Sequence, residues 1–144
     1  MIDTNIIVHF VRASATYELL EKNIPLLSNN LNIYFSEVSV GEILSFSKRN
    51  KWGSKKIQRM EILLDSLTIF PISYSGIYEA YADIDAYSQN HPTLSLPQGM
   101  TARNMGKNDL WIAATAHILR ATLVTTDKDF DHLQHFFDLE WVKQ

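Results

Sequence analysis

The sequence contains no cysteine. This absence excludes disulfide bonds, thiolate zinc sites and catalytic thiols, and it favours a reducing compartment. No apolar run approaches the roughly 20 residues needed to span a bilayer. The N-terminus also lacks a basic segment followed by a long apolar stretch, so we expect no signal peptide. By default, the sequence predicts a cytoplasmic protein without membrane contact.

A strong excess of positive charge is also missing. The 13 Lys and Arg residues face 16 Asp and Glu residues, which gives a formal net charge of −3. The chain therefore lacks the strongly basic character typical of many nucleic-acid-binding domains. Local distribution matters more than the total, and six of the 13 basic residues fall within residues 48–59. An acidic centre with a basic margin is one arrangement that holds a metal ion and attracts phosphate.

A length of 144 residues and a hydrophobic content of 46% predict one domain, residues 1–144, with one core. Short β-rich runs alternate with helical stretches, which predicts an α/β fold. We expect a three-layer α/β/α sandwich with a central, mostly parallel sheet. Helices are expected over residues 5–11, 13–27, 51–66 and 109–119 and after Ser36 or Ser39 and Ser73 or Ser75; strands are expected at residues 1–2, 33–35, 67–70, 122–125 and 139–142, and residues 91–106 show no period.

Four acidic residues stand where an α/β chain would gather them. Asp3 follows the first apolar residues, and Asp127 ends a strand-like run. Glu42 lies within an apolar helical stretch, and Asp109 opens a later helix. Ligands of open parallel sheets bind beyond the carboxyl ends of the strands, where Asp3 and Asp127 are expected. A carboxylate cluster repels itself unless a cation neutralises it, and all-oxygen ligation favours Mg²⁺. The pattern indicates a metal-dependent hydrolase.

Each acid also has a simpler interpretation. Asp3 and Asp109 could serve only as helix N-terminal residues that interact favourably with the helix dipole. Glu42 taken alone is a solvated helix residue, and Asp127 and Asp129 could terminate a strand and cap the next turn. Taken jointly, the four acids favour a shared site over coincidence.

Four segments in this order resemble the PIN-domain ribonucleases, and the likeness is closest to VapC-type toxins of type II toxin–antitoxin pairs. The segments are Asp3-Thr4-Asn5, the Ser- and Val-rich helix with Glu42, Asn108-Asp109 with Ile112-Ala113-Ala114, and Thr125–Phe130. The resemblance covers nearly the whole chain. It implies an α/β/α sandwich, RNA cleavage that depends on Mg²⁺ or Mn²⁺, a homodimer, and inhibition by a co-expressed antitoxin protein.

The resemblance also assigns site residues. The family's acidic set falls on Asp3, Glu42, Asp109 and Asp127. We expect Asp3 and Asp109 to be the principal metal ligands, with Asp127 as a further ligand. Glu42 or Asp127 could hold metal-bound water or accept its proton, and the sequence does not decide which. The supporting positions are Thr4, Asn5, Asn108, Thr125, Thr126 and Asp129.

Two groups of basic residues could contact RNA phosphates. Arg103 and Lys107 precede Asp109, although they could be ordinary loop charges. The second group surrounds Trp52, which could stack on a base. A solvated helix face whose Trp packs sideways is the slightly favoured interpretation. This group comprises Lys48, Arg49, Lys51, Lys55, Lys56 and Arg59.

The five histidines do not suggest a catalytic set with Ser and Asp. His132 and His135 have a spacing that could bring them together on a helix, but further ligands are not obvious, so we expect surface histidines. His9 and His117 lie within apolar helices, where we expect hydrogen-bonded, partly buried side chains.

Two other functions compete with an RNA-cleaving toxin. The first is a non-catalytic module that binds nucleic acid or protein, although a pure RNA binder gains nothing from concentrated negative charge. The second is a phosphatase with Asp3 as the nucleophile. That chemistry usually needs a second acid two residues later, where Asn5 stands.

Overall fold

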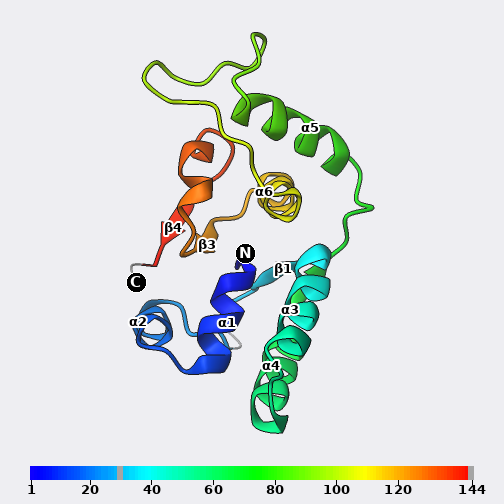
Figure 1. Ribbon diagram of the computed structural model, residues 1–144, viewed down its shortest axis with the longest axis vertical. Coiled ribbons are helices and arrows are strands. Elements are labelled where there is room, and N and C mark those ends of the chain that lie inside the picture. The colour runs from blue at the N-terminus through cyan, green and yellow to red at the C-terminus, as the bar shows by residue number, and fades with distance from the viewer. Residues whose placement is uncertain (29–30, 143–144) are drawn as a thin grey trace.

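The computed structural model describes residues 1–28 and 31–142 (Figure 1). In these residues no helix combines the length and the apolar character that crossing a membrane would require. The helices are α1 (Thr4–Arg12), α2 (Ala15–Asn23), α3 (Glu37–Arg49), α4 (Ser54–Ser66), α5 (Ile77–Ser88), α6 (Lys107–Leu119) and the 3₁₀ helix η1 (Lys128–Leu133); the strands are β1 (Tyr34–Ser36), β2 (Thr68–Phe70), β3 (Leu123–Thr125) and β4 (Leu139–Trp141).

The first residues of the chain lie in the middle of the sheet. β1 pairs in parallel with β2, and β3 pairs in parallel with β4. Between these pairs, the N–H of Ile2 donates to the Tyr34 carbonyl (3.0 Å), and the N–H of Asp3 donates to the Val124 carbonyl (3.0 Å). Ile2 also forms a parallel bridge with Val124. The expected two-residue end of a strand is therefore a central link between the two pairs.

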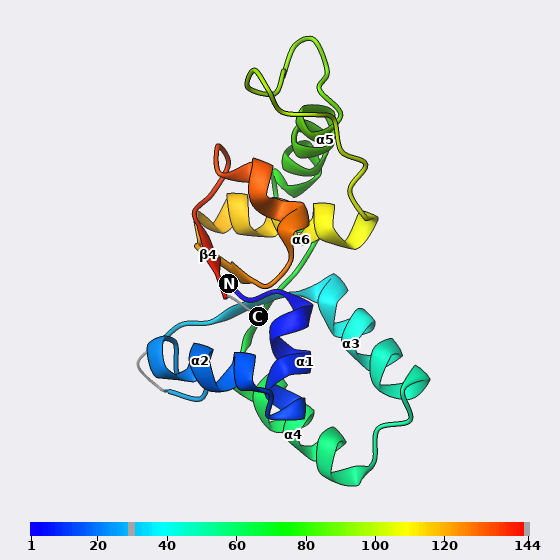
Figure 2. The same cartoon turned by 60° about the vertical axis from the view of Figure 1, so that its left-hand side comes forward.

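Helices cover both sides of the sheet. The helices α1 to α4 lie on one side with a core around Phe35, whereas α5, α6 and η1 lie on the other with a core around Phe130 (Figures 1 and 2). Both phenylalanines are fully buried. This arrangement confirms the predicted α/β/α sandwich and its parallel strands.

The helix predicted over residues 13–27 is too long. The α-helix α2 ends at Asn23, and Ile24 has φ −133° and ψ 84°. Pro25 explains this end, because the proline ring disfavours the helical conformation of the residue before it. The other predicted helices are present with shifted ends, and α6 begins at Lys107, two residues earlier than expected.

The 3₁₀ helix η1 was not predicted, and it makes the surface interpretation of His132 wrong. Phe130 and Leu133 of η1 enter the core, and His132 between them is 4% exposed. The His132 Nε2 lies 2.8 Å from the Ser88 Oγ of α5. His135 is exposed, as expected. A buried hydrogen bond between α5 and η1 thus replaces the expected surface histidine.

His9 and His117 are half-buried and hydrogen-bonded, which confirms the predictions for both. The His9 Nδ1 lies 2.9 Å from the Ser14 Oγ, and the His117 Nδ1 lies 2.9 Å from the Phe136 carbonyl oxygen.

Residues 91–106 contain no helix or strand, as their sequence predicts. They cross the upper end of the molecule in Figure 1, between α5 and α6. The N–H of Arg103 donates to the Ser88 carbonyl (2.7 Å), and Leu96 and Met105 are buried. These contacts hold the segment against the helical layer that contains α5 and α6.

Candidate metal centre

Asp3 lies at the carboxyl end of the central link and immediately before α1. Asp3 is only 3% exposed, and its Oδ2 accepts a hydrogen bond from the Thr125 Oγ1 (2.8 Å). Burial raises the pKa of Asp3 to about 7, and the nearby Asp109 and Glu42 add to the rise. Hydrogen bonds from Thr125 and the Thr4 backbone oppose it. A buried acid with acidic neighbours needs a proton or a cation.

Thr125 connects Asp3 to Asp127. The Thr125 Oγ1 accepts a hydrogen bond from the Asp127 N–H (2.9 Å) while it donates to Asp3. The Asp127 Oδ1 in turn accepts from the Asp129 N–H (2.9 Å), and Asp127 is the N-cap of η1. One buried hydroxyl therefore sets the positions of two acidic residues at adjacent strand ends.

Thr125→Val removes that hydroxyl and keeps nearly the same shape. It leaves the Asp127 N–H without this acceptor and Asp3 without this donor. We expect the free energy of unfolding to fall by about 1–3 kcal/mol, the usual cost of leaving buried polar groups without partners. Urea unfolding measures the change. The control is Thr101→Val at an exposed loop position, which should change the value by less than about 0.5 kcal/mol. Equal losses in both variants would contradict the role of the hydroxyl.

Glu42 approaches the same place from α3. It is half-buried, and its Oε2 accepts a hydrogen bond from the Thr4 Oγ1 (2.6 Å). Thr4 is the first residue of α1, directly after Asp3. Glu42 is therefore not the freely solvated helix residue of the simpler interpretation.

Asp109 lies in the first turn of α6. Its carboxylate accepts a hydrogen bond from the Gly106 backbone, and burial raises its pKa to about 6, with Asp127, Glu42 and Asp129 as further causes. A Cβ atom added to Gly106 would lie 2.6 Å from the Asp109 Oδ2. Glycine at position 106 thus leaves room for this carboxylate, a role that sequence reasoning missed.

The structure brings the four predicted acids and Asp129 into one electrostatic cluster. Asp109 and Glu42 raise the pKa of Asp3, and Asp127, Glu42 and Asp129 raise the pKa of Asp109. In the described residues the one ion pair joins Arg103 to Asp131, so none of the five has a basic partner. Asp127 is the N-cap of η1 and Asp109 lies in the first turn of α6, so these two acids have a helix-end role and also belong to the cluster. The cluster comprises Asp3, Glu42, Asp109, Asp127 and Asp129.

The chemistry of these donors fits a hard divalent cation. All are carboxylate oxygens, and Mg²⁺ is usually held by one or two carboxylates together with water and substrate phosphate. Within residues 1–28 and 31–142, no three His, Asp or Glu side chains are already arranged to hold one ion. Three of these carboxylates accept hydrogen bonds within the protein: Asp109 from the Gly106 backbone, Asp127 from the Asp129 N–H, and Glu42 from the Thr4 Oγ1.

The remaining predicted residues differ in exposure and in how firmly the structure holds them. Asn5 and Thr126 are half-buried, and Asn108 and Lys107 are exposed at the start of α6. Arg103 is held by its ion pair with Asp131 (2.6 Å) and by a hydrogen bond to the Lys128 carbonyl (3.0 Å). Lys107 is therefore the less restrained of the two predicted phosphate contacts.

Trp52 packs sideways, as the favoured interpretation of its basic surroundings expected. Its ring meets the Phe46 ring edge-on with centroids 5.6 Å apart. Arg59 is also structural, since its guanidinium lies over the Phe10 ring and donates to the Phe10 carbonyl (2.8 Å). Both side chains therefore take part in packing within the protein.

Comparison with known proteins identifies the family. A family model described as the PIN domain matches residues 1–135. The chain belongs to the PIN domain family. A search of curated proteins returned no match.

Solved structures share the fold of this PIN domain. The crystal structure of VapBC2 from Rickettsia felis, bound to a DNA fragment from its promoter, superposes with a TM-score of 0.77 at 24% identity, covering 99% of this chain and 98% of that chain. A toxin–antitoxin complex from Klebsiella pneumoniae gives a TM-score of 0.61 at 21% identity, covering 90% of this chain and 88% of that chain. At these identities the likeness supports the fold.

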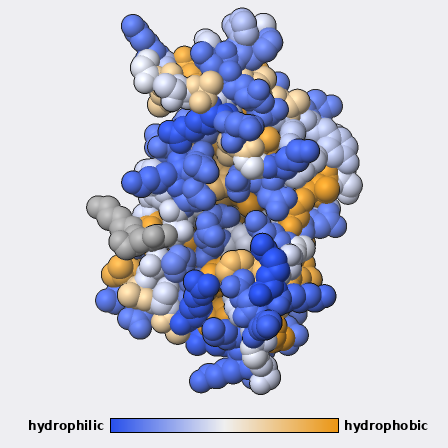
Figure 3. Space-filling view, viewed as in Figure 1, coloured by the Kyte–Doolittle hydropathy of each residue, from blue (hydrophilic) through white to orange (hydrophobic). Residues whose placement is uncertain are grey.

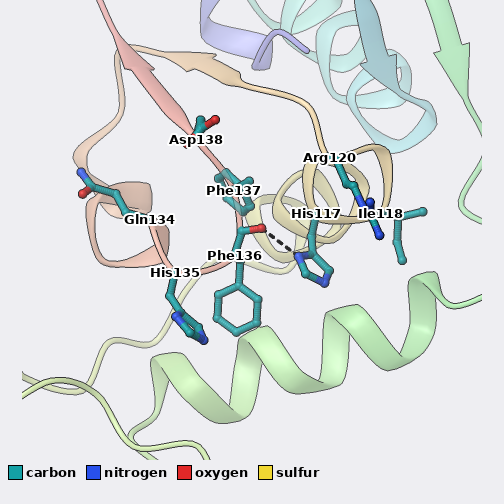
Figure 4. Close-up of a pocket in the computed structure, with 8 residues that line it drawn as sticks. All are labelled: His117, Ile118, Arg120, Gln134, His135, Phe136, Phe137 and Asp138. Atoms are coloured by element: carbon teal, nitrogen blue, oxygen red, sulfur yellow. Dashed lines mark hydrogen bonds between the residues drawn. The ribbon is translucent and has the colours of Figure 1, made fainter.

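A cavity of about 540 Å³ lies at the opposite end of α6 in this PIN domain (Figure 4). His117 and Arg120 line it from α6 and its C-cap, and His135 lines it from the segment after η1. His117 is eight positions after Asp109, about 12 Å along the helix axis. Among the described residues, Asp138 is the only acid that lines this cavity, so the cavity lacks the donors of the candidate metal centre.

Proposed function

We propose that residues 1–144 form a single metal-dependent endoribonuclease domain that acts as the toxin of a toxin–antitoxin pair. The observation that supports this most is the cluster of five carboxylates from four separate segments, in which Asp3 is buried and none has a basic partner among the described residues. Such an arrangement costs stability as it stands. A bound Mg²⁺ or Mn²⁺ ion would neutralise it.

The proposed chemistry is hydrolysis of an RNA phosphodiester. A carboxylate-bound divalent cation supplies two effects when present: it lowers the pKa of a bound water, and it polarises the phosphate. Asp3 and Asp109 would hold the ion, with Asp127 as a further ligand. Glu42 would orient the attacking water or accept its proton, a role that Asp127 could share. Thr4 and Thr125 would position Glu42 and Asp3 through the hydrogen bonds described above.

The toxin role implies a cognate antitoxin protein, and we include a homodimer in the proposal. Support comes from the two structural neighbours, which are a VapBC complex and a toxin–antitoxin complex. Large apolar side chains are also exposed on and around α2 and β4, and the face in Figure 3 shows separate hydrophobic patches on a mostly hydrophilic surface. These side chains are Leu19, Leu27, Leu31 and Trp141.

Incubation of the purified protein with single-stranded RNA tests this proposal. Cleavage should appear with Mg²⁺ or Mn²⁺ and disappear with EDTA, and added metal should restore it. A single-stranded DNA of the same sequence and para-nitrophenyl phosphate serve as comparison substrates. RNA binding without cleavage in either metal would favour the non-catalytic binding module instead. Hydrolysis of para-nitrophenyl phosphate alone would favour the phosphatase.

A further inference from the structure

A groove leads away from Glu42 along α3. It encloses about 560 Å³ and is lined by one face of α3 and by Asn108 at the start of α6. Figure 2 shows α3 leaving the sheet beside the start of α6 and running towards its connection with α4. The α3 residues that line the groove are Val38, Gly41, Glu42, Ser45 and Arg49.

The groove has a carboxylate at one end and a guanidinium at the other. Glu42, Ser45 and Arg49 recur at intervals of three and four residues, which places them on one helix face. Arg49 is seven positions after Glu42, about 10 Å along the helix axis. The groove is open beside Glu42, because a Cβ added to the lining residue Gly41 would meet no atom within 4 Å. The backbone of a single-stranded nucleic acid could occupy this length.

Arg49 is available for such a strand. It is exposed, and the described part of the chain shows no acidic partner for it. By contrast, Arg59 of α4 is held against Phe10. In a chain of net charge −3, a polyanion that approaches five carboxylates needs local positive charge along its path.

We infer that this groove binds the RNA segment adjacent to the scissile phosphate, with Arg49 contacting the phosphate of a neighbouring nucleotide and Asn108 contacting the ribose or base between. The inference rests on the proposed function, since it places the RNA next to a scissile phosphate that is bound at the carboxylate cluster. It makes Arg49 an RNA-binding residue that acts at a distance from the reacting atoms.

RNA affinity measured as a function of NaCl concentration tests the groove. The experiment uses a labelled, randomised single-stranded 20-mer RNA with Mg²⁺ and Asp109→Asn protein, in which cleavage should be disabled. Adding Arg49→Gln should weaken binding about fivefold and reduce the slope of log K against log [salt] by about 0.7, the contribution of one phosphate contact on a single strand. Arg49→Lys should preserve the slope, because the slope depends on charge.

Lys55→Gln is the matched control. Lys55 is exposed on α4 and does not line the groove, so this variant has the same charge change as Arg49→Gln without the proposed contact. Equal slopes for Arg49→Gln and Lys55→Gln would overturn the groove assignment. In a cleaving background, Arg49→Gln should raise KM several-fold and leave kcat unchanged. If the wild type binds RNA through Arg49 and cuts none, the nuclease proposal fails while the groove remains.

Discussion

Asp3→Asn and Asp109→Asn are each expected to lower metal-dependent RNA cleavage by about a hundredfold or more. Each variant removes a charged oxygen that would hold the cation and keeps nearly the same side-chain volume. The loss should be this large because metal-assisted hydrolysis depends on the ion for both the nucleophile and charge stabilisation. The measurement is kcat/KM on single-stranded RNA at saturating Mg²⁺ or Mn²⁺.

Asp65→Asn provides the control for this pair, because Asp65 is exposed on α4, outside the carboxylate cluster. It should retain wild-type activity. As a second measurement, expression of the wild type without an antitoxin should arrest bacterial growth, and Asp3→Asn or Asp109→Asn should relieve the arrest. Full cleavage by both variants would refute the proposed mechanism.

The metal-free protein is expected to lose stability as pH rises from about 4 to about 7. In the folded state the pKa of Asp3 is raised to about 7, mainly by burial, whereas the unfolded carboxyl titrates near 3.9. Between these values the folded state binds more protons than the unfolded state, so its stability falls as pH increases. A shift of about three pKa units corresponds to about 4 kcal/mol.

Comparison of the wild type with Asp3→Asn isolates this contribution from that of the other carboxylates. Urea unfolding in EDTA at pH 4.5 and pH 8 should show the wild type losing about 3–4 kcal/mol relative to Asp3→Asn, since asparagine resembles the protonated acid at both pH values. Mg²⁺ at pH 8 should recover part of the loss in the wild type. Parallel pH profiles for the two proteins would show that Asp3 ionises without penalty.

Local sequence patterns predicted much of this fold. Apolar residues at helical spacing predicted α3 and α4, and Pro25 explains why α2 ends where it does. Thr125 hydrogen-bonds to both Asp3 and Asp127, the two acids expected at the ends of parallel strands, which place their carboxyl ends at one edge. Their roles in metal binding and catalysis stay predictions.

The contacts that shape the site depend on docking, which no local pattern records. Thr4 and Glu42 are separated by 38 positions, and their hydrogen bond requires the start of α1 to meet α3. The burial of His132 likewise requires η1 to pack on α5. The groove was partly visible in the sequence, because Glu42, Ser45 and Arg49 share helical spacing. The sequence also placed Arg49 in the basic group around Trp52, for which a solvated helix face was the slightly favoured interpretation.

The central position of the first residues has a consequence for synthesis. Thr125 and Asp3 are 122 positions apart, yet their hydrogen bond and the adjoining strand pairing form the centre of the sheet. Contacts so distant in the chain form late, because closing a long loop precedes any gain from them. A chain emerging from the ribosome therefore exposes Asp3 long before Asp127 exists. An incomplete translation product would lack the assembled carboxylates, and under the proposed function it would not cleave RNA.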